Sequence, residues 1–340
     1  MVSSVASSVS SFSDPFANLV GQDQAKILLN RAVALARIAP GYLFVGPDGT
    51  GKALAATGFA RLLLRSSSDG TDGMVEAETD VILERRIRDR NHPDLLWVEP
   101  TYLHQGKLLT ASAAAAAGLN RKGLPRIRLE QIREIARFLS RPALESPRAV
   151  VVIEQGNQMA EAAANALLKT LEEPGRASII LMAPNQQSLL PTLVSRAQAI
   201  PFRRLNPEQM AQVLQQTGYG EVLHSVEVMA IAQGSPGRAI SSWQQLQQLQ
   251  TAAPELLAQV GQVPTTRRAT LELAREISQL LDTEAQLWLL DYLQHRYWQQ
   301  GIGNADTLAT LEKSRRYLTA FVQPRLVWEM TLLAQLTQMS

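Results

Sequence analysis

The stretch Tyr42-Leu-Phe-Val-Gly-Pro-Asp-Gly-Thr-Gly-Lys52-Ala53 contains the spacing Gly-x-x-x-x-Gly-Lys of a phosphate-binding loop. It begins with apolar residues typical of a strand, and a helical pattern follows over residues 52–64. Glycines in such a loop let backbone N–H groups surround a phosphate, and the lysine adds positive charge. The stretch therefore predicts a strand–loop–helix unit that holds a nucleotide. The candidate contacts are Gly46, Gly49, Gly51 and Lys52.

Two positions depart from the pattern of a nucleotide-hydrolysing site. The residue after the lysine normally carries a hydroxyl that holds Mg²⁺, and Ala53 cannot coordinate a metal. The apolar run at residues 149–153 ends in Glu154-Gln155, where hydrolysing proteins of this architecture place a metal-binding carboxylate and a second one that activates water. Glu154 could reach a metal, but Gln155 cannot accept a proton. Both residues could equally be polar caps at a strand end.

Composition sets limits on the class of protein. The chain has 340 residues, 46% hydrophobic and 19% charged, which is ordinary for a globular protein with two or three domains. Arginine far outnumbers lysine, yet the net charge is only +2, so any nucleic-acid contact should be local. Cysteine is absent, which excludes disulfides, thiolate metal sites and cysteine nucleophiles.

The chain shows no targeting or membrane signal. It has no apolar run of 18 residues, so we expect no membrane span. Residues 1–15 are rich in serine and lack the basic region and apolar core of a secretory signal, so we expect a disordered tail. A cytoplasmic location is the default expectation.

Short apolar runs alternate with amphipathic helical patterns in the first two thirds of the chain. Uninterrupted apolar strands of this kind predict an α/β domain with a parallel sheet covered on both faces. The expected strands are residues 43–45, 95–98, 149–153, 179–183 and 199–202, and the expected helices between or before them are residues 23–38, 52–64, 129–140 and 159–173.

After residue 202 the sequence predicts helices only. We expect an α/β domain over residues 16–205, a small helical domain over 206–248 and a helical bundle over 249–340. Asn206 should cap a helix that begins at Pro207. An alanine-rich insertion at about 104–124 interrupts the first domain, and we expect it to be exposed and poorly ordered.

Several longer motifs identify a family. They are Val20-Gly-Gln22, His92-Pro-Asp-Leu95, Asn165-Ala-Leu-Leu-Lys-Thr-Leu-Glu-Glu-Pro174, Leu190-Pro-Thr-Leu-Val-Ser-Arg196 and Gly234-Ser-Pro-Gly-Arg238. With these the chain resembles, over nearly its whole length, the delta-prime subunits of bacterial DNA polymerase III clamp loaders, which belong to the AAA+ class. The resemblance implies an AAA+ P-loop domain, a helical lid and a C-terminal helical collar that mediates oligomerisation.

The resemblance also assigns roles to two arginines. It implies that Arg196 reaches the γ-phosphate of ATP bound to a neighbouring subunit, where a guanidinium stabilises developing charge. The alternative is an arginine that caps residues 199–202 or pairs with a surface carboxylate. Arg238 matches the family's second-sensor arginine, which contacts bound nucleotide from the lid domain, although a structural role in its helix-start turn is also open. The first-sensor position corresponds to Pro184, with Asn185 one place late, and proline offers no polar side chain.

Two further regions bear on metal and DNA. Many proteins of this family carry a four-cysteine zinc module where this chain has residues 66–91, so we expect no zinc here. Arg133, Arg137 and Arg141 are spaced by four and line one helix face. They could contact primer-template DNA inside the loader or form a solvated face.

These observations lead to one preferred function. We expect a non-hydrolysing stator of the clamp loader, with a degenerate site that requires no cofactor and could bind ATP or ADP without turnover. Its implied partners are the gamma/tau ATPase and delta subunits, the sliding clamp and primer-template DNA. The alternatives are a catalytically active AAA+ ATPase subunit and a nucleic-acid-binding adaptor that uses the arginine clusters.

Overall fold

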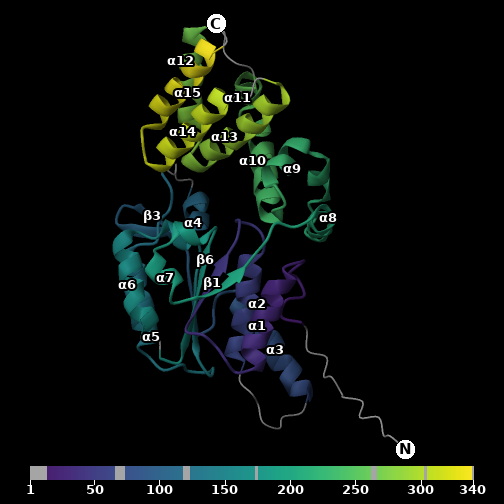
Figure 1. Cartoon of the computed structure of the whole chain (residues 1–340), viewed down its shortest axis with the longest axis vertical. Coiled ribbons are helices and arrows are strands. Elements are labelled where there is room, and N and C mark those ends of the chain that lie inside the picture. The colour runs from purple at the N-terminus through teal and green to yellow at the C-terminus, as the bar shows by residue number, and fades with distance from the viewer. Residues whose placement is uncertain are drawn as a thin grey trace, which may run out of the picture. The chain divides into compact units, whose positions relative to one another are not determined.

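A five-stranded sheet lies at the centre of the first of two compact units (Figure 1). The computed structural model describes residues 14–65, 73–117, 123–172, 175–261, 266–301 and 305–338. The first unit comprises Met1–Pro100 and Ile127–Arg203, and the second comprises Thr101–Arg126 and Arg204–Ser340. The predicted tail at residues 1–15 lies almost wholly outside the described residues.

All neighbouring strands of the sheet are parallel, in the order β2-β5-β6-β1-β7. The strands are β1 (Gly41–Val45), β2 (Leu95–Val98), β5 (Ala149–Ile153), β6 (Ala177–Ala183) and β7 (Gln198–Pro201). Every residue of β5 and β6 is buried, as expected for central strands covered on both faces. The predicted α/β fold class with a parallel sheet is confirmed, and each of the five predicted strands is present.

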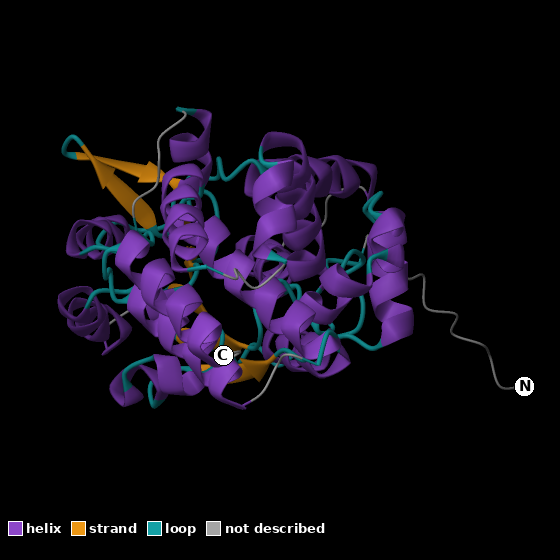
Figure 2. Ribbon diagram, turned by 90° about the horizontal axis from the view of Figure 1, so that it is seen from above, coloured by secondary structure: helices purple, strands orange, loops and turns teal. Residues whose placement is uncertain are grey.

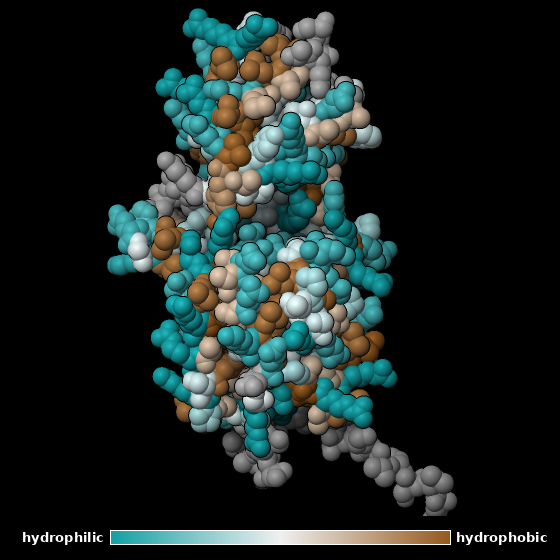
Figure 3. Space-filling model, turned by 60° about the vertical axis from the view of Figure 1, so that its left-hand side comes forward, coloured by the Kyte–Doolittle hydropathy of each residue, from teal (hydrophilic) through white to brown (hydrophobic). Residues whose placement is uncertain are grey.

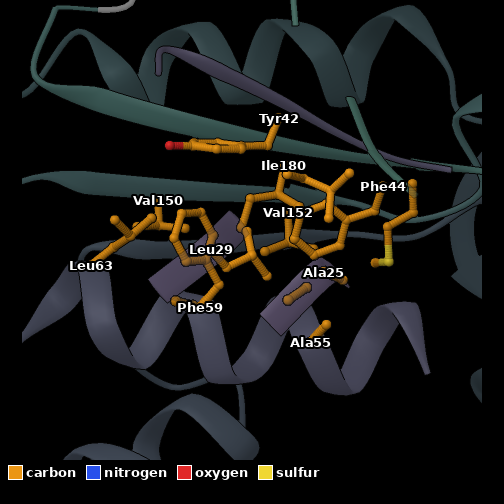
Figure 4. Close-up of a cluster of buried hydrophobic side chains, with 14 of the residues drawn as sticks. Ala25, Leu29, Tyr42, Phe44, Ala55, Phe59, Leu63, Val150, Val152 and Ile180 are labelled. Atoms are coloured by element: carbon orange, nitrogen blue, oxygen red, sulfur yellow. The ribbon is translucent and has the colours of Figure 1, made fainter. Parts of the chain in front are cut away.

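Each face of the sheet is covered by helices from different parts of the chain (Figure 1). On one face, α1 (Asp23–Ala34) and α2 (Lys52–Leu64) bury Leu29 and Phe59 against sheet residues such as Tyr42 and Val150 (Figure 4). The Tyr42 and Phe59 rings meet edge to face with centroids 4.8 Å apart. On the other face, a second core around Leu167 is formed by α5 (Leu129–Leu139), α6 (Glu161–Glu172) and α7 (Pro191–Val194). The phosphate-loop strand β1 is therefore fixed from both sides.

The helices of the first unit include the four predicted ones, and also α3 (Gly73–Arg88) and α7, which were not predicted from the sequence. They are α1 (Asp23–Ala34), α2 (Lys52–Leu64), α3 (Gly73–Arg88), α5 (Leu129–Leu139), α6 (Glu161–Glu172) and α7 (Pro191–Val194). The helix predicted over residues 23–38 ends at Ala34 instead. Ala36 adopts a left-handed conformation (φ 51), which a continuing α-helix cannot contain.

The second unit is mainly helical after Arg204, as predicted. Its helices are α8 (Pro207–Gln216), α9 (Val226–Ala232), α10 (Pro236–Ala252), α11 (Pro254–Val260), α12 (Arg267–Leu280), α13 (Thr283–Gln299), α14 (Ala305–Thr319) and α15 (Pro324–Gln338). Asn206 caps α8 by accepting a hydrogen bond from the Gln209 N–H, and Pro207 is the first helical residue, which confirms the predicted cap. Helix α10 runs through position 248, where we placed the end of the lid, and the division into lid and collar stays a prediction.

Residues 101–126, which contain the predicted insertion, are more regular than the sequence suggested. They form an antiparallel hairpin of β3 (Thr101–His104) and β4 (Lys107–Thr110), visible as the orange pair at the edge of Figure 2, and the short helix α4 (Ala111–Ala116). Ala114 in the alanine run is 1% exposed, so the expected exposure is wrong at this position. Residues 118–122 lie outside the described residues.

This hairpin segment packs within the second unit rather than on the sheet. The Tyr102 hydroxyl donates to the Glu284 carboxylate at 2.8 Å, and the Gly123 N–H donates to the Thr283 hydroxyl at 2.9 Å. The Arg126 guanidinium lies 4.6 Å from the Phe321 ring centroid. The segment therefore interrupts the first unit in sequence while belonging by its contacts to the helical unit.

The surface is mixed in polarity. On the face that Figure 3 displays, apolar side chains form small patches separated by polar ones. Among the described helices, none combines the length and the apolar composition that crossing a bilayer requires.

Candidate functional site

The glycine-rich loop lies where the sequence places it, between the carboxyl end of β1 and the start of α2. Gly46 donates its N–H to the Ala183 carbonyl at 3.2 Å, and a Cβ at this position would overlap the Phe202 carbonyl oxygen. Gly49 and Gly51 have φ values of 76 and 100, which favour glycine. Close approach and left-handed backbone thus explain all three glycines.

Lys52 directs its ammonium group back into the loop. It donates to the carbonyl oxygen of Gly46, to that of Pro47 at 3.0 Å and to the Asp48 carboxylate at 3.0 Å. An ammonium has three N–H donors, so all three are engaged within the loop. Burial lowers the pKa of Lys52 below its ordinary value, partly opposed by Asp48. A phosphate could gain this lysine only by displacing an existing partner.

No hydroxyl of the loop is available to a metal. Ala53 presents a methyl group at the start of α2. Thr50 has the loop's one hydroxyl, is 2% exposed and donates that hydroxyl to the Pro47 carbonyl at 2.8 Å. The position that normally binds Mg²⁺ is therefore not replaced by a neighbour within residues 46–53.

Gln22 connects the loop to the end of β7, a role that the sequence did not reveal. Its side-chain N–H₂ group donates to the carbonyl oxygens of Thr50 at 3.1 Å and Arg203 at 2.7 Å, and its carbonyl accepts from the Arg203 N–H at 2.9 Å. Gln22 itself has φ 57. The motif Val20-Gly-Gln22 marked the family, but partners 28 and 181 residues away leave no local signal.

Glu154 lies, like the loop, where the carboxyl ends of the parallel strands meet, and it interacts with β2, the outermost strand of the sheet. Its carboxylate accepts from Trp97 Nε1 at 2.6 Å and from Arg90 at 3.3 Å. Arg90 also pairs with Glu99 and lies 4.7 Å from the Trp97 ring centroid. Burial raises the pKa of Glu154, and Glu99 adds to this, while Trp97 and Arg90 oppose it. This carboxylate serves a local cluster, and the next residue, Gln155, supplies no base.

The first-sensor position also offers no polar side chain to a nucleotide, because it is a proline. Pro184 follows β6, and the side chain of Asn185 accepts a hydrogen bond from the Ser188 N–H at 2.8 Å, capping the short 3₁₀ turn Gln186–Ser188. Its carbonyl oxygen is thus used in a local turn. The structure brings the loop, Glu154 and Pro184 to one edge of the sheet, as the shared direction of parallel strands requires.

Arg196 lies at the opposite edge. It precedes β7, whose Gln198 pairs with Tyr42 near the start of β1, and the Arg196 carbonyl oxygen is 3.2 Å from an ideal Cβ on Gly41. Gly46 is five residues further along the chain than Gly41, a distance of about 16 Å at the usual strand rise. The guanidinium is 40% exposed, pairs with Glu172 at 2.9 Å and donates to the Thr192 carbonyl at 3.2 Å.

Arg238 belongs to the second unit and forms an ion pair there. It lies in the first turn of α10 and contacts Asp291 of α13 at 3.0 Å, and Asp291 also pairs with Arg315 of α14. One carboxylate thus joins three helices of the helical unit. This geometry favours the structural role for Arg238 that the sequence left open.

We expect Arg238→Ala to lower the free energy of unfolding of the second unit by about 1 kcal/mol, because the pair is partly exposed and screened. Asp291→Asn should have a similar effect, and the double variant should cost less than the sum. The free energy of unfolding is measured from urea titrations in which the opening of the second unit is monitored by amide hydrogen exchange in α13. Arg268→Ala, which removes an exposed pair with Glu272, is the matched control. Additive effects of Arg238→Ala and Asp291→Asn would contradict the coupling.

Comparison with known proteins gives two family matches that together cover most of the chain. Residues 21–206 match the family model described as "DNA polymerase III, delta subunit". Residues 208–335 match the model described as "Cyanobacterial DNA polymerase III delta prime, C-terminal domain".

Individual relatives agree with these matches. The chain is 34% identical over 188 residues to DNA polymerase III subunit delta' of Bacillus subtilis, which is 55% of this chain and 49% of that protein. It is 30% identical over 216 residues to the subunit of the same name from Pseudomonas aeruginosa, covering 59% of this chain and 55% of that one. The chain thus spans about half the length of the curated relatives it matches.

A solved structure supports the fold. A DNA polymerase III gamma subunit-related protein from Thermotoga maritima superposes with a TM-score of 0.51 at 17% identity, covering 94% of this chain and 100% of that chain. At this level of identity the likeness concerns the fold alone.

Proposed function

The chain belongs to the DNA polymerase III delta-prime subunit family, and on this premise we propose that it is a non-hydrolysing stator of a clamp loader. In this role it helps to place a sliding clamp on primed DNA, in a hetero-oligomer with gamma/tau ATPase and delta subunits. Arg196 acts in the ATP site of the adjacent subunit.

The observation that carries this proposal is the position of Arg196 relative to the chain's own loop. The arginine lies at the amino edge of the sheet and Gly46–Lys52 at the carboxyl edge, separated by the length of β1. A guanidinium at that distance cannot touch a phosphate held by its own loop. Any phosphate that Arg196 stabilises therefore belongs to another molecule, which supports action in trans.

The contacts of the loop also favour a subunit that does not hydrolyse ATP at its own site. Lys52 uses its three donors inside the loop, Ala53 offers no metal ligand, and Glu154 is held by Trp97 and Arg90. ATP or ADP binding without hydrolysis is compatible with these contacts, and the proposal requires no resident cofactor and no zinc.

ATP turnover by the purified chain tests the first part of the proposal. We expect the turnover to equal that of its Lys52→Ala variant, with or without clamp and primed DNA, because the wild-type site lacks a metal hydroxyl and a base. Circular dichroism of both proteins controls for folding. Multiple turnover that the variant loses would instead establish an active AAA+ ATPase and overturn the stator.

A further inference from the structure

A groove in the first unit lies away from the nucleotide loop. It has a volume of about 430 Å³ and is bounded by α5, by the turn that follows α5, by the residues that lead into the edge strand β2 and by Leu96 of that strand. We call it the α5 groove. Its apolar lining includes Leu96, Phe138, Pro142 and Leu144.

Leu144 is the most exposed large apolar side chain among the described residues, at 77%. Its backbone is firmly held, because the N–H groups of Leu144, Glu145 and Ser146 donate to the Asp94 carboxylate at 2.6, 2.8 and 2.8 Å. An apolar side chain on a flexible loop would need no explanation. Here a fixed backbone exposes Leu144 beside the apolar lining of the α5 groove, and this arrangement favours a ligand with an apolar side chain.

The rim of the groove is positively charged. Arg137 and Arg141 line it, and Arg133 lies one turn before Arg137 on α5. No carboxylate of the described residues lies within ion-pair distance of these three arginines, whereas Arg61, Arg86, Arg90 and Arg196 of the same unit all have acidic partners.

Two carboxylates also line the groove, and they leave the rim positive. Asp94 is 2% exposed, and three N–H groups already hold its charge. Glu134 is exposed on α5 and is a single negative charge beside three arginines. A ligand that brings carboxylates therefore finds unpaired guanidinium groups.

We propose that the α5 groove binds a short acidic peptide segment of another protein, with a large apolar side chain seated beside Phe138 and Leu144 and carboxylates on Arg137 and Arg141. This site is independent of the proposed stator function. Nucleic acid fits less well, because phosphate contacts require cations but no apolar hollow. Among the described residues that line the groove, Phe138 is the one aromatic side chain and is half-buried, whereas binding of single-stranded nucleic acid by stacking uses aromatic side chains for successive bases.

Selection of peptides on the full-length chain tests the proposal. A random dodecapeptide phage library should yield sequences that share at least two Asp or Glu residues and one Leu, Ile, Phe or Trp. Fluorescence anisotropy of a synthetic selected peptide should then show at least tenfold weaker binding to the Arg137→Glu/Arg141→Glu variant and to Leu144→Ser. The matched control is Arg31→Glu/Arg37→Glu, which makes the same charge change at exposed arginines on and just after α1, and it should bind as wild type.

Three results would overturn the proposal. One is a selection that gives no acidic–apolar consensus. Another is a selected peptide that binds the Arg137→Glu/Arg141→Glu variant as tightly as wild type. The third is binding of a fluorescent primer-template duplex that needs Arg137 and Arg141 but survives Leu144→Ser, which would make the groove a phosphate site.

Discussion

Replacing Arg196 with alanine in a reconstituted loader should lower DNA-stimulated ATP turnover at the adjacent site by about 1000-fold, the lower end of the range for trans-acting arginines. Removing the guanidinium removes charge stabilisation at the transferring phosphoryl group and leaves the loop of the neighbour intact. Single-turnover hydrolysis, measured with only the adjacent subunit competent for ATP, isolates this effect from the other sites of the loader.

Assembly should be unchanged by this substitution. Arg196 is 40% exposed in the single chain and makes one surface ion pair with Glu172, worth little in stability. Size-exclusion chromatography of the loader therefore gives the folding control. Arg196→Lys should recover only part of the rate, since an ammonium lacks the planar fork.

Glu172→Ala is the matched control for the same ion pair. It removes the partner that holds Arg196 in the isolated chain while leaving the guanidinium in place. We expect turnover at or slightly above the wild-type rate. An assembled loader with Arg196→Ala and wild-type turnover would remove the trans role.

The largest expected stability effect is at Asp94. Asp94→Ala should lower the free energy of unfolding of the first unit by about 3 kcal/mol, because three backbone N–H groups lose a buried charged acceptor. Asp94→Asn keeps one acceptor oxygen and should lose less. Amide exchange in β5 and β6, compared between variant and wild type at each pH, measures the change. Asp89→Ala, which removes an exposed 3.8 Å pair with Arg85, should change it by no more than about 0.5 kcal/mol.

The effect of Asp94 should depend on pH. Burial acts to raise the pKa of Asp94, but the hydrogen bonds from residues 144–146 and the nearby His92 outweigh it and hold the pKa below its ordinary value. A carboxyl group with a lowered folded-state pKa stabilises the protein above its unfolded pKa, about 3.9, and loses this as pH falls through the folded value. The difference between wild type and Asp94→Ala should thus be constant above about pH 5 and shrink below about pH 4. A difference independent of pH would contradict this account.

The sequence predicted the sheet well because its strands are short, uninterrupted apolar runs. Runs such as residues 149–153 are buried on both faces, and burial of that kind leaves a direct trace in composition. The hairpin of β3 and β4 left no such trace. Its turn is Gln105-Gly106, both with positive φ, whereas the usual signal for such turns is Asn or Asp before glycine.

The candidate site was predicted in its parts but not in its contacts. Spacing alone located Gly46, Gly51 and Lys52, since a phosphate loop is a local structure. Spacing could not show that Lys52 turns into the loop, because its contacts depend on the path of the loop backbone. Nor could it show that Trp97 donates to Glu154, because that contact depends on the pairing of β2 with β5. The same applies to Arg196, whose distance from the loop follows from the register of β1 with β7.

That register also gives the subunit a direction. With a loop at one end of the sheet's strands and an arginine at the other, subunits in which the arginine reaches the loop of a neighbour join head to tail. If Arg196 acts in the ATP site of a neighbour while Gly46–Lys52 supports no hydrolysis, the interface at this chain's own loop is the one at which no ATP is hydrolysed. A closed ring with one such member would then hydrolyse ATP at one interface fewer than its number of subunit contacts.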